Sequence, residues 1–193
     1  MYVTEDILKQ VELKYGSPDV ACFHQRMVWP EFELLVNSMK HDRAHDVTLF
    51  IFYGSELVTI RKHMHPAGVF RAPSGGLRPG EDFEEGTLRE AYEETGLQVQ
   101  LDRYILRAHV TFVYGEREIQ WTSHVFTAKY LSGEMMPIDT KEIAEVRQVS
   151  IEELQTGIRD RLLASGSGGL AYRVALTDKV VELLRQGRFL NVS

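Results

Sequence analysis

Residues 75–97 read GGLRPGEDFEEGTLREAYEETGL, and the interpretation of the whole chain begins from this stretch. It opens as a glycine-rich loop. Residues 84–95 then have the composition of a helix, and Gly96 is a suitable residue to end it. Seven of the residues in the stretch are acidic. The sequence therefore predicts a loop that leads into a strongly acidic helix.

The two faces of this predicted helix differ in character. One face is expected to pack against a sheet, and it comprises Leu88, Ala91, Tyr92 and Thr95. Glu90, Glu93 and Glu94 fall on the opposite side, on adjacent turns, where their charges repel one another. A hard divalent cation relieves such repulsion, and Mg²⁺ or Mn²⁺ bound this way commonly also binds substrate phosphates. A solvated acidic surface is the alternative interpretation of an isolated glutamate-rich helix.

The spacing of the stretch is more specific than its charge. Gly75 is followed by five residues, Glu81, seven residues and then the run REAYEETGL at residues 89–97. This resembles the Nudix box, G-x5-E-x7-R-E-U-x-E-E-x-G-U, where U is an apolar residue. Every fixed position is present, with the small residue Ala91 at the first apolar position. Agreement at so many positions favours the resemblance over a simple surface helix.

The resemblance implies a Nudix-like fold of the α+β class, an α/β/α sandwich with a mixed sheet. It also implies hydrolysis of the diphosphate bond in a nucleoside diphosphate linked to another moiety, with Mg²⁺ or Mn²⁺. The implied metal ligands are Gly75, through its carbonyl, Glu90, Glu93 and Glu94. The implied catalytic residues are Glu90, Glu93 and a later glutamate, for which Glu142 is expected first and Glu145 next. Glu81 and Arg89 would form a supporting ion pair.

Three arginines and one tyrosine are candidate substrate-binding residues. Arg61, Arg71 and Arg78 precede or enter the box and are suited to binding phosphates, although ordinary surface charge is an equal alternative. Tyr114 lies 17 residues beyond Leu97, about where a tyrosine accompanies dinucleoside polyphosphate hydrolases in the family; packing in a hairpin is the alternative. A catalytically silent Nudix-fold domain that binds a nucleotide or a partner is the rival function, and the intact box favours the enzyme.

The periodicity of the chain predicts three regions. Residues 1–45 are expected to be an N-terminal extension of three helices, the second built on Val20, Phe23, Met27 and Val28. Residues 46–155 are expected to form the Nudix domain, with strands near 47–52, 57–60, 68–71, 97–101, 104–114, 118–129 and 146–151. Ser150 has the spacing of a capping box that opens a helix. Residues 156–193 are expected to be a linker and a helix, 170–185, that packs on the core.

Composition limits the classes of function. The 193 residues are 44% hydrophobic and 26% charged, as in globular proteins. With 22 basic and 28 acidic residues the net charge is −6, which disfavours nucleic acid polymers and anionic membranes as partners. A lone cysteine and the lack of signal-peptide features predict a cytoplasmic protein. Association of the N-terminal helices into a homodimer is a further option.

Overall fold

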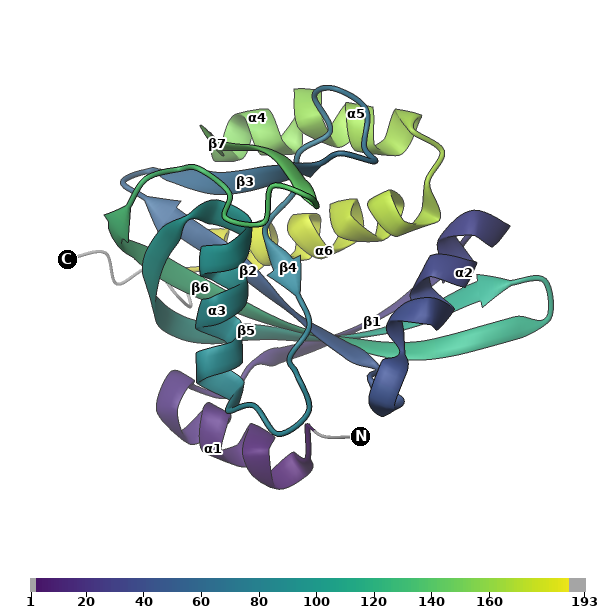
Figure 1. Cartoon of the computed structure of the whole chain (residues 1–193), viewed down its shortest axis with the longest axis horizontal. Coiled ribbons are helices and arrows are strands. Elements are labelled where there is room, and N and C mark those ends of the chain that lie inside the picture. Colours follow the sequence, from purple (N-terminus) through teal and green to yellow (C-terminus); the bar gives the residue numbers. More distant parts are fainter. Residues whose placement is uncertain (1–2, 188–193) are drawn as a thin grey trace.

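A computed structural model describes residues 3–187 and places a mixed sheet at the centre of the molecule (Figure 1). The sheet has the spatial order β1-β5-β6-β2-β3-β7, and β4 pairs with β2. The strands are β1 (Asp19–Arg26), β2 (His45–Tyr53), β3 (Glu56–Lys62), β4 (Ser74–Gly75), β5 (Leu97–Tyr114), β6 (Arg117–Gly133) and β7 (Ile143–Val149). The pairs β1–β5 and β2–β6 are parallel, and the other pairs are antiparallel.

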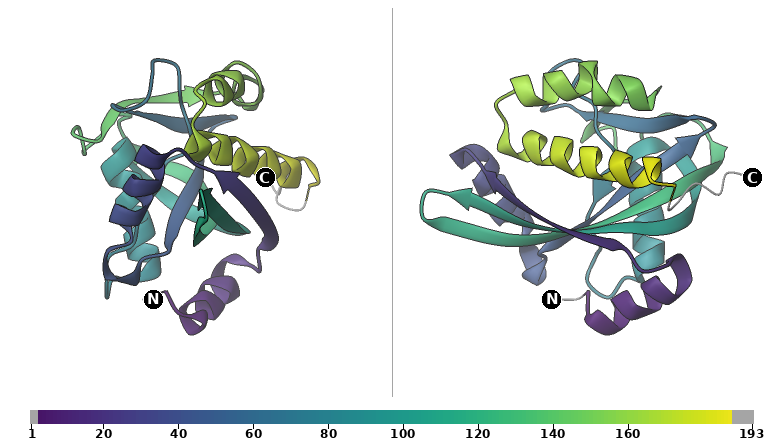
Figure 2. Two further views of the ribbon diagram at one scale, coloured as in Figure 1. Left: turned by 90° about the vertical axis from the view of Figure 1, so that its right-hand side faces the viewer. Right: turned by 180° about the vertical axis from the view of Figure 1, so that it is seen from behind.

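Helices cover both faces of the sheet, as Figures 1 and 2 show. They are α1 (Glu5–Tyr15), α2 (Trp29–Ser38), the short 3-10 helix η1 (Lys40–Asp42), α3 (Phe83–Thr95), α4 (Ile151–Gln155), α5 (Gly157–Ala164) and α6 (Gly168–Arg185). Apolar side chains of α1 and α3 form one hydrophobic cluster with the sheet, and those of α4, α5 and α6 form another on the opposite face. The predicted α/β/α sandwich is therefore confirmed. No helix within residues 3–187 combines the length and apolar character needed to cross a bilayer.

The N-terminal region contains a strand where a second helix was predicted. Helices form at α1 and α2, but residues 19–26 are β1, which pairs in parallel with β5 from Asp19↔Leu106 to Arg26↔Val113. Burial alternates along β1 with a period of two. The prediction was wrong because β5, which supplies the partner strand, lies about 85 residues away. Residues 19–26 thus belong to the sheet, while the boundaries proposed at 45 and 155 stay predictions.

Most other expected elements form, with shifted limits. The strands expected at 97–101 and 104–114 are one strand, β5, whose register with β6 shifts near Leu101 and Tyr104. Residues 68–71 form only an isolated bridge between Ile60 and Arg71, and the strand lies later, at β4. The predicted capping of α4 is confirmed, because the Ser150 hydroxyl accepts from the Glu153 amide at 3.0 Å. The expected C-terminal helix is α6.

The C-terminal helix begins directly against the end of β1. Gly168 is the first residue of α6, and a Cβ atom at this position would overlap the carbonyl oxygen of Arg26, the last residue of β1. Close approach of two backbones is a common reason for glycine. Segments on either side of the box region therefore pack against each other.

Replacing Gly168 with alanine tests this contact. We expect Gly168→Ala to lower the free energy of unfolding by about 1–3 kcal/mol, because the backbones of α6 and β1 must separate. Gly157→Ala is the matched control: Gly157 also begins a helix, and its added Cβ would meet nothing within 4 Å. Equal unfolding free energies for the two variants in a denaturant titration would contradict the packing described.

Candidate active site

Helix α3 carries the box and has well-defined ends. The Asp82 carboxylate caps its start by accepting from the amides of Glu84 and Glu85 at 2.9 and 3.1 Å. Gly96 ends it with φ of 75°, in the left-handed region that favours glycine. These caps fix where the box glutamates lie relative to the sheet.

The buried face of α3 differs from the predicted one. Ala91 and Thr95 are buried as expected, but Tyr92 is 44% exposed. Glu94, which was expected among the outward carboxylates, is only 5% exposed. A helical wheel gives only the direction of each side chain around the helix axis. It cannot show that Lys62 and Arg71, from other parts of the chain, lie close to Glu94. One acidic residue of the box thus points inward.

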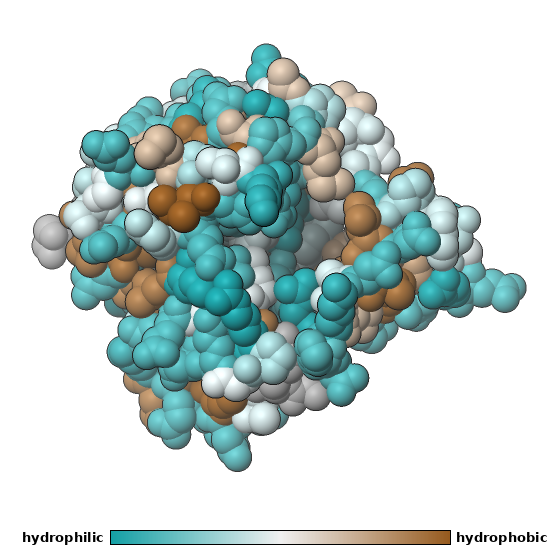
Figure 3. Space-filling view, in the orientation of Figure 1, coloured by the Kyte–Doolittle hydropathy of each residue, from teal (hydrophilic) through white to brown (hydrophobic). Residues whose placement is uncertain are grey.

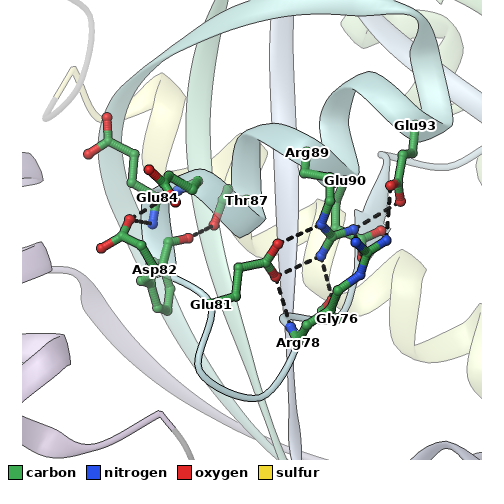
Figure 4. A network of polar contacts seen from close by, with 11 residues as sticks. Gly76, Arg78, Glu81, Asp82, Glu84, Thr87, Arg89, Glu90 and Glu93 are labelled. Atoms are coloured by element: carbon green, nitrogen blue, oxygen red, sulfur yellow. Dashed lines mark hydrogen bonds and ion pairs between the residues drawn. The ribbon is translucent and has the colours of Figure 1, made fainter.

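Arg89 binds the carboxylates of three glutamates (Figure 4). Its Nε and Nη2 donate to Glu81 at 2.6 and 2.8 Å, and its Nη1 donates to Glu90 and Glu93 at 2.9 Å each. The hydrogen bonds from Arg89 lower the pKa of Glu81. The predicted Glu81–Arg89 ion pair forms, and the same guanidinium also offsets repulsion between Glu90 and Glu93. Its supporting role in the reaction stays a prediction.

Glu90 lies against the first glycine of the box. A Cβ atom at Gly75 would overlap the Glu90 carboxylate, so this loop position admits no larger side chain without displacing it. Burial raises the pKa of Glu90 above its ordinary value, an effect that Arg89 partly opposes. The loop and the glutamate are therefore in direct contact.

Glu94 is held beneath the same loop. Its Oε2 accepts from the Ser74 amide at 2.7 Å, and its Oε1 lies 3.9 Å from Arg71 and 4.0 Å from Lys62. Burial raises the pKa of Glu94 to about 7 although the two cations act in the opposite direction. A buried carboxylate with a raised pKa, close to a second one, is a common feature of functional sites.

A cavity of about 440 Å³ opens beside these residues, in the hollow between α3 and α2 visible in Figure 3. Glu90, Glu94 and Glu142 line it together with Gly75 and Arg71. Glu142 forms an ion pair with Lys62 at the cavity, whereas Glu145 pairs with Arg61 at 3.3 Å and is outside the lining. The structure thus brings Glu142, the preferred later glutamate, to the box residues.

Six of the predicted site residues lie outside the cavity lining, namely Glu81, Arg89, Glu93, Arg61, Arg78 and Tyr114. Arg61 pairs with Glu145, and Arg78 donates to the Glu93 carboxylate at 3.0 Å, so that Glu93 is held by two arginines. Tyr114 packs against two aromatic side chains of α2. Its ring centroid lies 5.3 Å from that of Trp29 and 5.9 Å from that of Phe32. The structure places Arg78 on the Glu93 carboxylate but does not bring Arg61 or Tyr114 to the box carboxylates. The roles of all three residues in binding substrate stay predictions.

The donor set fits a magnesium or manganese ion that is completed by substrate. Within residues 3–187 no three His, Cys, Asp or Glu side chains form a ready-made metal cage. However, Mg²⁺ is usually bound by one or two carboxylates together with substrate phosphates and water. Glu90 and Glu94 supply such carboxylates at the cavity. Because Gly75 has no side chain, the Glu90 carboxylate can lie directly against the backbone of the loop.

Three charged residues of the cavity, Arg173, Asp46 and Arg43, were not identified from the sequence. Arg173 of α6 donates to Asp46 of β2 at 2.7 Å, and both line the cavity although 127 positions separate them. Arg43, between η1 and β2, also lines it. No local pattern marks these residues, because their positions depend on how α6 and α2 pack on the sheet.

Comparison with known proteins identifies the family. The NUDIX domain model matches residues 42–166, well over half of the 193 residues. The chain belongs to the Nudix family. This confirms the resemblance carried by the box.

Individual relatives match over shorter stretches. The putative mutator protein MutT4 of Mycobacterium tuberculosis (strain CDC 1551 / Oshkosh) is 35% identical over 82 residues, 42% of this chain and 33% of that protein. An NAD-capped RNA hydrolase of Schizosaccharomyces pombe (strain 972 / ATCC 24843) is 31% identical over 68 residues, 34% and 18% of the two chains. The match thus spans a third or less of these relatives. A Nudix hydrolase structure from Nitrosomonas europaea shares the fold, with a TM-score of 0.54, 18% identity and coverage of 78% and 95%.

Removing the Arg89 guanidinium tests how the box carboxylates are held together. We expect Arg89→Ala to lower the free energy of unfolding by about 2–3 kcal/mol in metal-free buffer, because three largely buried carboxylates lose their counter-charge. In the control variant Arg159→Ala, loss of the more exposed ion pair with Asp178 should cost at most about 1 kcal/mol. Denaturant titrations compare the two, and similar small losses would show that Arg89 does not stabilise the cluster.

Proposed function

We propose that this protein hydrolyses the diphosphate bond of a nucleoside diphosphate linked to another moiety, using Mg²⁺ or Mn²⁺. The observation that carries the proposal is the meeting of Glu90, Glu94 and Glu142 with the glycine loop at one cavity. Family membership supports the same chemistry.

The residues proposed to hold the metal are Glu90, Glu93, Glu94 and the carbonyl of Gly75. A bound divalent cation would supply charge neutralisation at the phosphates and a more acidic water molecule. Arg89 holds Glu90 and Glu93 side by side, and the Ser74 amide fixes Glu94. The protein thereby prearranges the carboxylates, so little rearrangement is needed when the cation binds.

Glu142 is the proposed proton acceptor for the attacking water. Its carboxylate lines the cavity and is paired with Lys62, which keeps it beside the box. An ionised carboxylate in that position can remove a proton as the water attacks phosphorus. Glu90 is the second candidate for this role. Arg71 donates to the Ala72 carbonyl and the Ser74 hydroxyl at 2.8 Å, so its charge is fixed next to the phosphate region.

The cavity has an apolar side suited to the non-phosphate part of a substrate. The side chains that form it are Met27, Leu34, Leu35, Phe112, Trp121 and Leu170. Apolar walls with a few polar groups are typical of small-molecule sites. We therefore propose a small nucleoside diphosphate derivative as substrate. NAD-capped RNA is a further substrate to be tested, because the Schizosaccharomyces pombe relative is named an NAD-capped RNA hydrolase.

The proposal is tested by product release from a panel of substrates. The panel contains ADP-ribose, NADH, diadenosine polyphosphates, nucleotide sugars, CoA, nucleoside triphosphates and an NAD-capped RNA, each with Mg²⁺ or Mn²⁺. We expect metal-dependent release of a nucleotide from at least one member. Turnover of none, with metal still bound, would favour the rival function of a catalytically silent binding domain.

Replacing Glu93 with glutamine tests the site itself. Glu93→Gln removes one ligand charge and should cut turnover by more than about 100-fold while leaving the unfolding midpoint unchanged. Glu85→Gln is the matched control, because Glu85 is an exposed glutamate of the same helix outside the fixed box positions. Equal turnover by the wild type and Glu93→Gln would contradict the assignment.

The oligomeric state and the cytoplasmic location stay predictions. Light scattering after size-exclusion chromatography would decide between monomer and homodimer. The measurement needs the intact chain, because a truncation at residue 45 would remove β1 from the sheet as well as α1 and α2.

A further inference from the structure

Arg43 enters the cavity from an unusual piece of backbone. The two residues before it, His41 and Asp42, have φ of 57° and 59°, in the left-handed region that side-chain-bearing residues seldom adopt. Such conformations persist where the surrounding structure holds them, and they concentrate at functional sites. The turn directs Arg43 towards the glycine loop of the box.

The Arg43 guanidinium occupies the space left by the second glycine of that loop. A Cβ atom at Gly76 would overlap Nη1 of Arg43, just as one at Gly75 would overlap the Glu90 carboxylate. The guanidinium also lies over the indole ring of Trp121, whose centroid is 5.6 Å from Cζ. Two successive glycines, with Cα atoms about 3.8 Å apart, thus leave room for the Glu90 carboxylate and the Arg43 guanidinium.

Among residues 3–187, Arg43 differs from the other cations of the cavity in having no anionic or carbonyl partner. Lys62 pairs with Glu142, Arg71 donates to the Ala72 carbonyl, and Arg173 donates to Asp46. Across residues 3–187, the Arg43 side chain makes neither a hydrogen bond nor an ion pair, and its Nε is buried without a partner. An unsatisfied buried donor is costly, and the same side chain lines the cavity, where a bound anion would offset the charge of the guanidinium.

We propose that Arg43 is a substrate-binding residue that takes anionic phosphoryl oxygens of the diphosphate. The inference rests on the proposed function, since Gly76 adjoins the residues that would hold the metal. A guanidinium lying over an indole ring keeps its N–H groups free in its own plane, and that planar fork matches phosphate oxygens. With a cation held by the box glutamates, Arg43 would add a second positive charge for the diphosphate. Arg43 favours substrates that carry charge at this position.

Binding of inorganic pyrophosphate with Mg²⁺ tests the proposal without turnover or a particular base. Titration calorimetry should show Arg43→Ala binding about tenfold more weakly than the wild type, with partial recovery in Arg43→Lys. Gly76→Ala should weaken binding similarly, because its methyl group displaces the same guanidinium. Gly76 lies outside the left-handed region, so alanine is compatible with its backbone. Gly157→Ala, with open space around it, should match the wild type.

The double variant Arg43→Ala/Gly76→Ala separates this mechanism from general damage to the loop. We expect it to bind no more weakly than Arg43→Ala alone, because both changes remove one interaction. Equal affinity of Arg43→Ala and the wild type, including no binding by either, would overturn the proposal, and so would additive losses in the double variant.

Failure of the proposed function is distinguishable from failure of this inference. Turnover of no panel member by the wild type would overturn the proposed hydrolysis and leave the pyrophosphate measurement standing. For a substrate found in the panel, Arg43→Ala should raise KM more than it lowers kcat, as expected when binding to the ground state is lost. A loss confined to kcat would contradict a binding role for Arg43.

Discussion

The site depends on holding like charges close together. Glu81, Glu90 and Glu93 share one arginine, Arg89, and Glu94 is buried near two further cations. Carboxylates collected in this way repel one another and are stabilised only by counter-charge. The helix, the loop and the cavity are the framework that keeps this arrangement intact. In the proposed function, a divalent cation and a phosphate group would replace part of the internal compensation.

The structure also requires glycine where the backbone closely approaches a side chain or another stretch of backbone. Gly75 and Gly76 admit Glu90 and Arg43, and Gly168 allows α6 to begin against β1. The last contact lies far from the box in sequence, but it places α6 beside the cavity, where Arg173 reaches Asp46. Segments that flank the box region therefore complete the pocket whose centre the box forms.

The sequence predicted the parts of the fold and site that depend on local pattern. Helix α3 and its glycine end follow from the local pattern of residues 84–96, and the Glu81–Arg89 pair follows from the family resemblance of the box. Strand β1 was mistaken for a helix because its burial comes from β5, and the inward position of Glu94 was missed because Lys62 and Arg71 arrive from elsewhere. The cavity position of Arg43 likewise depends on Trp121, 78 residues later. Long-range packing explains each difference.

Divalent-cation binding is the most direct test of the central claim, that the box carboxylates form a metal site completed by phosphate. Electron paramagnetic resonance can follow Mn²⁺ binding in the presence of pyrophosphate. The account predicts that Glu90→Gln binds Mn²⁺ much more weakly than the wild type, whereas Glu85→Gln on the same helix binds it normally. Equal Mn²⁺ affinity in Glu90→Gln and the wild type would contradict the account.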